Sequence, residues 1–335
     1  MTTIYYPSMP FSPEGGYAAT IGFFDGVHLG HRHLLRLLLQ EAGARGLHTM
    51  AVTFDRPPRE VVQPGWHPQL LTTLGEKAAL LSATGIDVLV VLRFDEAMAA
   101  LTARQFMGGV LHGQLGVSLL LTGYDNHFGH DRAASFADYV AYGRELGVEV
   151  VCAGAPARCA VAAADGLSSQ PGEGLPAAAC SSSLVRRLLT AGDVEAAAAC
   201  LLRPYAITGH VVHGEHKGHG LGFPTANLVA DEPLKLVPAK GVYAVEAVTA
   251  DGRRHHAMTN IGTRPTFGGA VQTLETNIFG FAGNIYGQPL TIGFVARLRP
   301  ERPFPSAAAL AEQLARDRLA AQQCLARREA GDHNI

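Results

Sequence analysis

Residues 18–31 read A-A-T-I-G-F-F-D-G-V-H-L-G-H, and this stretch decides the fold of the first half of the chain. The apolar run at 18–22 is typical of a buried strand, and the leucine-rich residues 34–39 continue at helical spacing. A helix N-terminus presents free N–H groups and the positive end of its dipole, which attract phosphate. His28 and His31 stand at this point, three residues apart. The pattern therefore predicts a phosphate site with both imidazoles on one face of the helix.

The rest of the first half alternates strand-like runs with helix-length amphipathic segments. The expected strands cover residues 49–54, 86–92, 117–122 and 147–151, and the expected helices lie around 76–83, 102–115 and 136–146. This alternation predicts an α/β fold with a Rossmann-like parallel sheet and helices on its faces. Ligands of such sheets bind beyond the carboxyl ends of the strands, which is where the histidine motif falls.

The second half follows a different pattern. Residues 153–180 are rich in Ala, Gly, Pro and Ser, as surface connections are, and two short helices are expected at 181–189 and 194–202. Short strands with Gly- and Pro-containing turns then predict a small antiparallel β-barrel. The expected strands cover residues 206–213, 241–247, 256–261, 274–279 and 290–298, and an expected helix over 306–328 ends the chain.

Composition narrows the class of protein. At 335 residues the chain exceeds the usual size of one core, so two domains are expected. A formal net charge of −2 gives no general attraction for nucleic acid or for an acidic membrane surface. Five cysteines without a C-x-x-C pair favour reduced thiols over a disulfide framework or a zinc site. No signal peptide or membrane-spanning run is recognisable, so we expect a cytoplasmic protein.

Phosphate chemistry is expected at two helix starts of the first half. His28 and His31 could donate hydrogen bonds to an α-phosphate that gains charge during attack. Hydroxyls at the second start, with one arginine, suit a leaving pyrophosphate. These residues are Ser181, Ser182, Ser183 and Arg186. Taken singly, a histidine pair also occurs as surface decoration and a serine run as a helix cap.

A second candidate site lies in the glycine-rich residues 209–227. Its glycines let the backbone approach phosphates closely, although such a hairpin is also an ordinary turn in a barrel. Thr225 and Asn227 follow directly, and their oxygens are hard ligands suited to Mg²⁺ with a nucleotide.

Several motifs make the chain resemble the bacterial bifunctional riboflavin kinase/FMN adenylyltransferase family. In the first half these are G-F-F-D-G-V-H-L-G-H, T-F-D-R-P-P-R-E-V, G-Y-D-N-H-F-G-H-D-R and S-S-S-L-V-R-R-L-L. The resemblance implies an adenylyltransferase domain over residues 1–187 that joins FMN and ATP to give FAD and pyrophosphate. It implies that His28 and His31 stabilise the α-phosphate, and that further residues bind ATP or flavin: Gly22, Phe24, Asp25 (which orders the turn), Gly26, Asp55 and Asp125, with Ser181–Ser183 and Arg186.

In the second half the resemblance rests on G-F-P-T-A-N-L, P-A-K-G-V-Y-A-V, N-I-G-T-R-P-T-F and L-E-T-N-I-F. It implies a riboflavin kinase domain over residues 188–335, an antiparallel β-barrel that ends in the C-terminal helix. Glu275 would be the general base that takes the proton of the ribityl 5′-hydroxyl, and Thr225 with Asn227 would bind Mg²⁺. The residues that the resemblance implies in ATP or flavin binding are Gly214, Lys217, Gly218, His219, Gly222, Pro224 and Arg299. Arg299 could equally form a plain surface salt bridge.

Four positions depart from the family pattern. Pro57 stands where a histidine is common, Asn126 and His127 replace His-Arg, and His219 replaces an arginine. Histidine is only partly charged at neutral pH, so the replacement of arginine by His127 and by His219 is expected to weaken phosphate or FMN contacts without abolishing activity.

Other classes of protein are weighed against this one. The H-x-G-H pattern also occurs in aminoacyl-tRNA synthetases, but the chain has no basic patch and no K-M-S-K-S-like loop. A non-catalytic flavin sensor would be expected to lack some of the catalytic residues, and all are present. A single-activity kinase or adenylyltransferase with the other site decayed stays open because of the four departures. We expect flavins and ATP as partners and no nucleic acid or membrane, and the sequence allows a weak or transient homo-oligomer.

Overall fold

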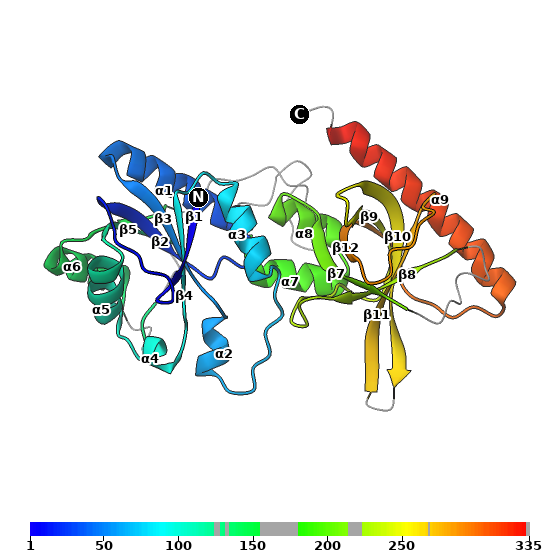
Figure 1. The fold of residues 1–335 in the computed structure, drawn as a ribbon, viewed down its shortest axis with the longest axis horizontal. Coiled ribbons are helices and arrows are strands. Elements are labelled where there is room, and N and C mark those ends of the chain that lie inside the picture. The colour runs from blue at the N-terminus through cyan, green and yellow to red at the C-terminus, as the bar shows by residue number, and fades with distance from the viewer. Residues whose placement is uncertain (124–127, 131–133, 155–179, 214–222, 267–268, 333–335) are drawn as a thin grey trace, which may run out of the picture. The chain divides into compact units, whose positions relative to one another are not determined.

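The computed structural model describes residues 1–123, 128–130, 134–154, 180–213, 223–266 and 269–332. The chain forms two compact units, Met1–Ser182 and Ser183–Ile335 (Figure 1). Each unit has its own sheet, so the expected division into an α/β half and a barrel half is confirmed. The functional boundary expected between residues 187 and 188 stays a prediction.

The first unit is built on six parallel strands in the order β1-β4-β3-β2-β5-β6. Its elements are β1 Thr2–Tyr6, β2 Tyr17–Ile21, α1 Leu29–Arg45, β3 His48–Phe54, α2 Pro58–Val62, α3 Leu74–Ser82, β4 Val88–Leu92, α4 Glu96–Ala99, α5 Ala103–Gln105, η1 Phe106–Gln114, β5 Val117–Thr122, α6 Phe136–Leu146 and β6 Glu149–Cys152. The edge strand β1 is absent from the sequence-based prediction. It carries polar and exposed residues, so its hydrophobic pattern is weak.

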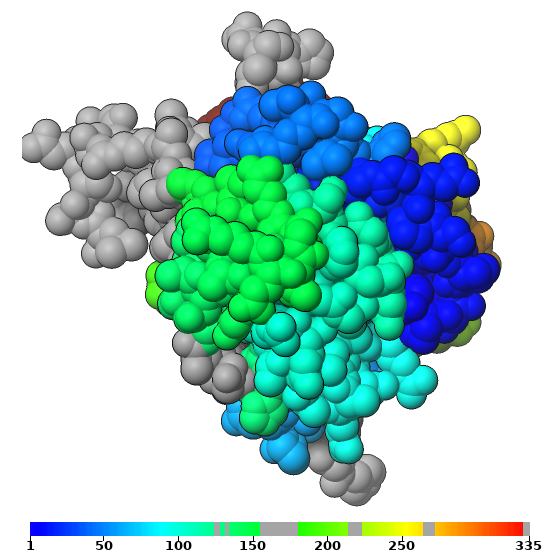
Figure 2. Space-filling model, turned by 90° about the vertical axis from the view of Figure 1, so that its left-hand side faces the viewer, coloured from blue at the N-terminus to red at the C-terminus, as the bar shows by residue number. Residues whose placement is uncertain are grey.

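Helices cover both faces of this sheet, and the strands alternate between two hydrophobic cores (Figure 1). Met50 and Val52 of β3 point to the core shared with η1 and α6, whereas Ala51 points to the core shared with α1 and α3. This period of two follows from the pleat of a strand. Figure 2 shows the outer surface of α6 in green beside that of η1.

The helix expected over residues 102–115 is divided into a single turn, α5, and the π-helix η1. A Cβ added to Gly113 would lie 3.0 Å from the Gly108 carbonyl oxygen, five residues earlier. The wide π turn therefore brings the backbone close at this point, and glycine has no side chain to obstruct it.

The second unit is a closed barrel in the order β10-β11-β8-β7-β12-β9, followed by a long helix. Its elements are α7 Ser182–Ala191, which begins at the unit boundary, α8 Val194–Leu201, β7 Tyr205–Val212, β8 Ala226–Ala230, β9 Gly241–Thr249, β10 Arg254–Thr266, β11 Gly269–Ile278, β12 Pro289–Arg299 and α9 Ala307–Asp332. All barrel pairings are antiparallel, as expected. Strand β8 was not predicted, since it is short and follows directly on the glycine-rich segment.

Helix α9 packs on the barrel through a small apolar cluster. Ala321 and Leu325 contact Ala244 of β9 and Met258 of β10. Among the described residues no helix is both long enough and apolar enough to cross a bilayer.

Candidate active sites

The first candidate site lies at the turn between β2 and α1. Phe24 and Val27 have left-handed φ angles of 53° and 42°, and both side chains are buried. A β-branched residue in this region is strained, so the surrounding packing must hold it there. Helix α1 starts with His28 at its N-cap, and the imidazole does not cap the helix. Among the described residues, the N-cap side chain therefore leaves the first N–H groups of α1 uncapped, as a phosphate-binding helix start requires.

The two histidines of this turn are stacked on each other. Their ring centroids are 3.7 Å apart with an interplanar angle of 24°, and the His31 ring also meets the edge of Phe24. Burial, and then the charges of His28 and Lys77, lower the pKa of His31 well below its ordinary value. His31 is thus neutral at pH 7. Its Nδ1 is buried and has no hydrogen-bond partner in the described part of the chain, which suits an imidazole awaiting a ligand.

Asp25 holds the turn in place. Its carboxylate accepts hydrogen bonds from the backbone N–H groups of Leu71 and Thr72 at 2.9–3.1 Å and from the Thr72 hydroxyl at 3.1 Å. The Gly26 N–H in turn donates to the Thr72 hydroxyl. Because Asp25 is only 2% exposed, this geometry agrees with the expected ordering role rather than with direct nucleotide contact.

The serine motif is brought to the same turn over a long sequence separation. The Ser182 hydroxyl donates to the Asp25 carbonyl oxygen at 2.8 Å. A Cβ added to Gly30 would lie 3.0 Å from the Cys180 carbonyl oxygen, so this segment packs closely on the first turn of α1. Ser181 precedes Ser182 there, and Ser183 and Arg186 continue along α7 in the second unit.

The other predicted residues of this site are placed less centrally. Asp55 follows β3, and its carboxylate accepts a hydrogen bond from the Phe94 N–H at 2.9 Å. Pro57, one of the departures, is the N-cap of α2. Asp125, Asn126 and His127 lie outside the described residues.

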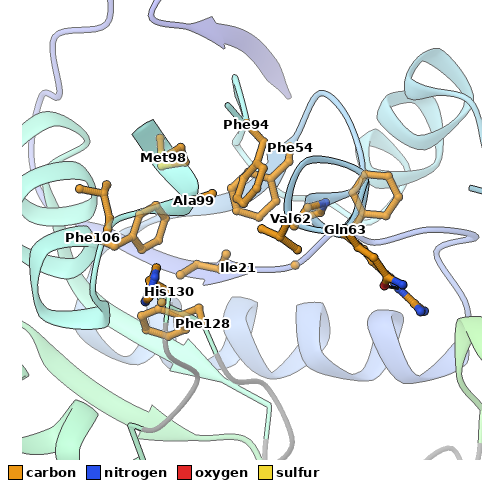
Figure 3. Close-up of a pocket in the computed structure, with 16 residues that line it drawn as sticks. Ile21, Phe54, Val62, Gln63, Phe94, Met98, Ala99, Phe106, Phe128 and His130 are labelled. Carbon is orange, nitrogen blue, oxygen red and sulfur yellow. Dashed lines mark hydrogen bonds between the residues drawn. The ribbon is translucent and has the colours of Figure 1, made fainter. Parts of the chain in front are cut away.

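A cavity of about 690 Å³ opens beside the turn, and sequence reasoning missed most of its lining. Figure 3 shows the Phe54 and Phe94 rings side by side, and Phe128 beside His130 across the cavity. The lining residues are Ile21, Gly22, Phe23, Phe54, Pro58, Arg59, Val62, Gln63, Phe94, Met98, Ala99, Leu101, Phe106, Phe128, Gly129 and His130. Phe54 is the last residue of β3, and Phe94 stands two residues after the end of β4; this position at the carboxyl ends of strands was the available signal.

In the second unit, strand pairing brings two predicted residues together. Glu275 of β11 lies directly opposite Asn227 of β8 in the antiparallel register. Directly opposed residues share a face of the sheet, with Cβ atoms about 5 Å apart. The neighbouring pair, Leu274 and Leu228, is buried. Because successive side chains of a strand alternate between the two faces, Glu275 and Asn227 point to the face opposite these leucines.

Thr225 stands immediately before β8. The Asn277 side-chain amide donates to the Pro224 carbonyl oxygen at 2.6 Å and so anchors this point of the chain to β11. Pro224 and Thr225 line a small cavity of about 130 Å³ with Thr276, Phe281 and others. The side-chain oxygen atoms of Thr225 and Asn227 are hard donors of the kind that fits Mg²⁺.

The remaining predicted residues of the second site divide into two groups. The glycine-rich residues Gly214, Lys217, Gly218, His219 and Gly222 lie outside the described part of the chain. Arg299 binds the carboxylate of Asp317 on α9 through three hydrogen bonds of 2.8–3.0 Å. Both side chains are buried or nearly buried, and the pair connects β12 to α9. The flavin-binding role expected for Arg299 stays a prediction.

The fold defines a class: a parallel α/β unit followed by a closed antiparallel barrel with a C-terminal helix. Residues 12–158 match the family described as FAD synthetase, and residues 201–325 match the family described as riboflavin kinase. The bifunctional riboflavin kinase/FMN adenylyltransferase of Escherichia coli K12 is 36% identical over 314 residues, 93% of this chain and 94% of the relative. The protein of the same name from Bacillus subtilis strain 168 is 32% identical over 302 residues, 89% of each chain.

One solved structure covers almost the whole chain. The crystal structure of a protein described as a macrolide-efflux protein from Streptococcus pneumoniae has a TM-score of 0.82 and 28% identity, over 96% of this chain and 99% of that one. The curated relatives settle the family. The chain belongs to the bifunctional riboflavin kinase/FMN adenylyltransferase family and contains both an FAD synthetase and a riboflavin kinase domain.

Proposed function

We propose that the two domains act on successive stages of flavin cofactor synthesis, each with ATP. The barrel unit phosphorylates riboflavin to FMN, and the α/β unit adenylylates FMN to FAD with release of pyrophosphate. The observation that carries this assignment is the match of both family domains on one chain, each with its own cluster of predicted catalytic residues.

In the first unit, an FMN phosphate oxygen attacks the α-phosphorus of ATP, and the bond to the pyrophosphate oxygen breaks. His28 and His31 donate hydrogen bonds to the α-phosphate oxygens as charge grows on them. The stacking of the two rings and the packing around them hold these donors in place before reaction. The neutral state of His31 at pH 7 leaves one ring N–H to donate. The uncapped start of α1 adds backbone N–H groups at the same place.

We assign the aromatic cavity of the first unit to the flavin. Its volume of about 690 Å³ falls in the usual range for a site that encloses a small molecule. Phenylalanine rings offer flat apolar faces for a tricyclic ring system, while Gln63 and His130 offer polar atoms at its margin. Gly22 lines the same cavity, so the flavin would lie next to the histidine turn.

In the second unit, Glu275 takes the proton of the ribityl 5′-hydroxyl as its oxygen attacks the γ-phosphorus of ATP, and ADP leaves. A carboxylate within hydrogen-bond reach of the alcohol is suited to this task. Thr225 and Asn227 would hold Mg²⁺, which when bound neutralises phosphate charge. The direct opposition of Asn227 and Glu275 supports placing metal and base next to each other.

We further propose that the protein works in the cytoplasm on flavins and ATP, without nucleic acid or a membrane, and can form a weak or transient homo-oligomer. The small formal net charge of −2 supports the absence of nucleic-acid and membrane partners.

Incubation of the purified protein with riboflavin and MgATP, followed by chromatography, tests the assignment. FMN and then FAD are expected. With FMN and MgATP alone, FAD and pyrophosphate are expected in equal amounts. Absence of both products would refute the proposed function, and a single product would reduce it to one activity.

A further inference from the structure

Lys77 on α3 is a buried lysine beside the first site to which no role has been given so far. Only 2% of its surface is exposed. Its Nζ lies 3.8 Å from the centroid of the Phe23 ring and donates to the Thr53 hydroxyl at 3.3 Å. The Thr53 hydroxyl donates in turn to the Phe23 carbonyl oxygen at 3.1 Å. The ammonium is therefore clamped between the segment that leads to the histidines and the end of β3.

Titratable groups from several elements interact with this ammonium: the carboxylate of Asp25 in the turn, the carboxylate of Asp55 after β3, and the imidazole of His31 in the first turn of α1, stacked on His28. Burial lowers the pKa of Lys77 to about 8, although the Asp25 and Asp55 carboxylates act in the opposite direction. The charge of Lys77 also contributes to the lowered pKa of His31.

A purely structural role would not require a lysine here. Burying an ammonium costs free energy unless it is fully compensated, and replacing buried charge by an apolar residue of similar volume is often neutral or stabilising. An ammonium has three donors, and Thr53 accepts one hydrogen bond from it in the described part of the chain. Burial of the Lys77 ammonium therefore costs free energy that its one hydrogen bond among the described residues does not fully offset.

We propose that Lys77 is a positioning residue for adenylyl transfer: its ammonium fixes the Phe23 segment against β3 and supplies the positive charge behind the His28–His31 pair. The inference rests on the proposed function of the first unit. Phe23 lines the flavin cavity, and the turn that follows it carries both histidines, so one cation braces both parts of the site.

The test compares Lys77→Met with wild type at saturating FMN and MgATP. We expect kcat for FAD formation to fall roughly 10- to 100-fold, because misplaced or electrostatically altered donors lose transition-state stabilisation. The KM for FMN should change little, riboflavin phosphorylation by the same sample should be unchanged, and the Tm should stay equal or rise. A wild-type kcat, or a loss that merely follows a lowered Tm, would overturn the inference.

Lys77→Arg gives a second and independent readout. Wild-type FAD formation should decline above pH 8 as Lys77 loses its proton, whereas the arginine variant keeps its charge and should lack that decline. It should also recover part of the kcat lost in Lys77→Met. If Lys77→Met does not fold, the arginine profile decides alone: persistence of the alkaline decline overturns the inference, and its disappearance supports it.

Lys235 provides the matched control. It is also buried, at 7% exposure, and its ammonium lies 5.2 Å from the Tyr205 ring in the other unit. Lys235→Met should leave the kcat and pH profile of FAD formation unchanged. A wild-type protein that forms no FAD would refute the proposed function and this inference with it. A wild type that forms FAD at a rate matched by Lys77→Met would refute only the inference.

Discussion

In the first unit, His28 and His31 stand at a strained turn held by hydrogen bonds from distant segments, whereas in the second unit Glu275 and Asn227 stand on paired strands. The turn depends on Asp25, Thr72 and Ser182 to keep Val27 at a φ of 42°. The strand pair is held by its register, by the buried leucines beside it and by the hydrogen bond from Asn277 to Pro224. The first arrangement can place two rings and a helix start around one phosphate, but its geometry is sensitive to changes outside the site. The second should tolerate remote changes better.

The largest effect is expected when the proposed base Glu275 is removed from the strand pair of the second unit while the turn of the first unit is left intact. Glu275→Gln keeps the shape of the side chain and removes its basicity, so we expect FMN formation to fall about 1,000-fold. FAD formation from supplied FMN should persist. Chromatographic rates for both steps measure this, and an unchanged kinase rate would remove Glu275 from the mechanism.

The ion pair between β12 and α9 tests the structural side of the second unit. Asp317→Ala leaves Arg299 buried without its partner, so we expect a loss of about 3 kcal/mol in the free energy of unfolding of this unit. Urea denaturation followed by circular dichroism measures the change. An exposed pair, Arg253 with Asp251, is the control, since Asp251→Ala should have almost no effect. Equal effects of the two variants would contradict a stabilising role of the Arg299–Asp317 pair.

Removing one histidine donor tests the first site directly. We expect His28→Ala to lower kcat for FAD formation about 100-fold, as loss of one preorganised donor to a transition-state oxyanion commonly does. Riboflavin kinase activity should be retained. If both activities fall together, the variant has damaged the fold rather than the site.

Gly30→Ala tests the sensitivity of the turn to a single methyl group. The new Cβ would lie 3.0 Å from the Cys180 carbonyl oxygen and 3.2 Å from the His28 imidazole, so the ring must shift. We expect a fall of about tenfold in FAD formation. Gly43→Ala in the same helix is the control, since its Cβ meets nothing within 4 Å and should only stabilise α1 slightly. Equal activities would show that the turn absorbs the shift.

The smallest expected effect concerns pH. The folded protein binds a proton on His31 less readily than the unfolded chain, whose pKa is near 6.5. The stability of the first unit should therefore be full above pH 6.5 and decrease as the pH falls below it, by less than about 1.4 kcal/mol per pH unit from this group. In thermal denaturation, the Tm of His31→Gln should decrease less than the wild-type Tm between pH 7.5 and pH 5.5. Identical slopes would contradict the lowered pKa.

Much of the fold was predictable, and candidate residues for both sites could be named, because the signals are local. The strand–turn–helix at residues 18–39 and the alternation of short strands with Gly- and Pro-containing turns were sufficient for the α/β and barrel units. His28, Glu275 and Asn227 belong to motifs that are contiguous in the sequence. Lys77, in contrast, looks like an ordinary surface lysine of a helix, and each phenylalanine of the cavity looks like a core residue. Periodicity cannot tell which buried residue faces a cavity.

The sequence alone determined most of the strands and helices and the chemical groups predicted for the two sites, because propensity, turn chemistry and residue type act over a few neighbouring residues. The tertiary structure decided which of these groups meet. The Ser182 hydroxyl reaches the Asp25 carbonyl across 157 positions of the chain, and the ammonium of Lys77 on α3 reaches Phe23 in the turn after β2. Glu275 meets Asn227 only because β11 pairs with β8 in one register. Such contacts depend on how sheets and helices pack in space, and that packing is a property of the whole unit.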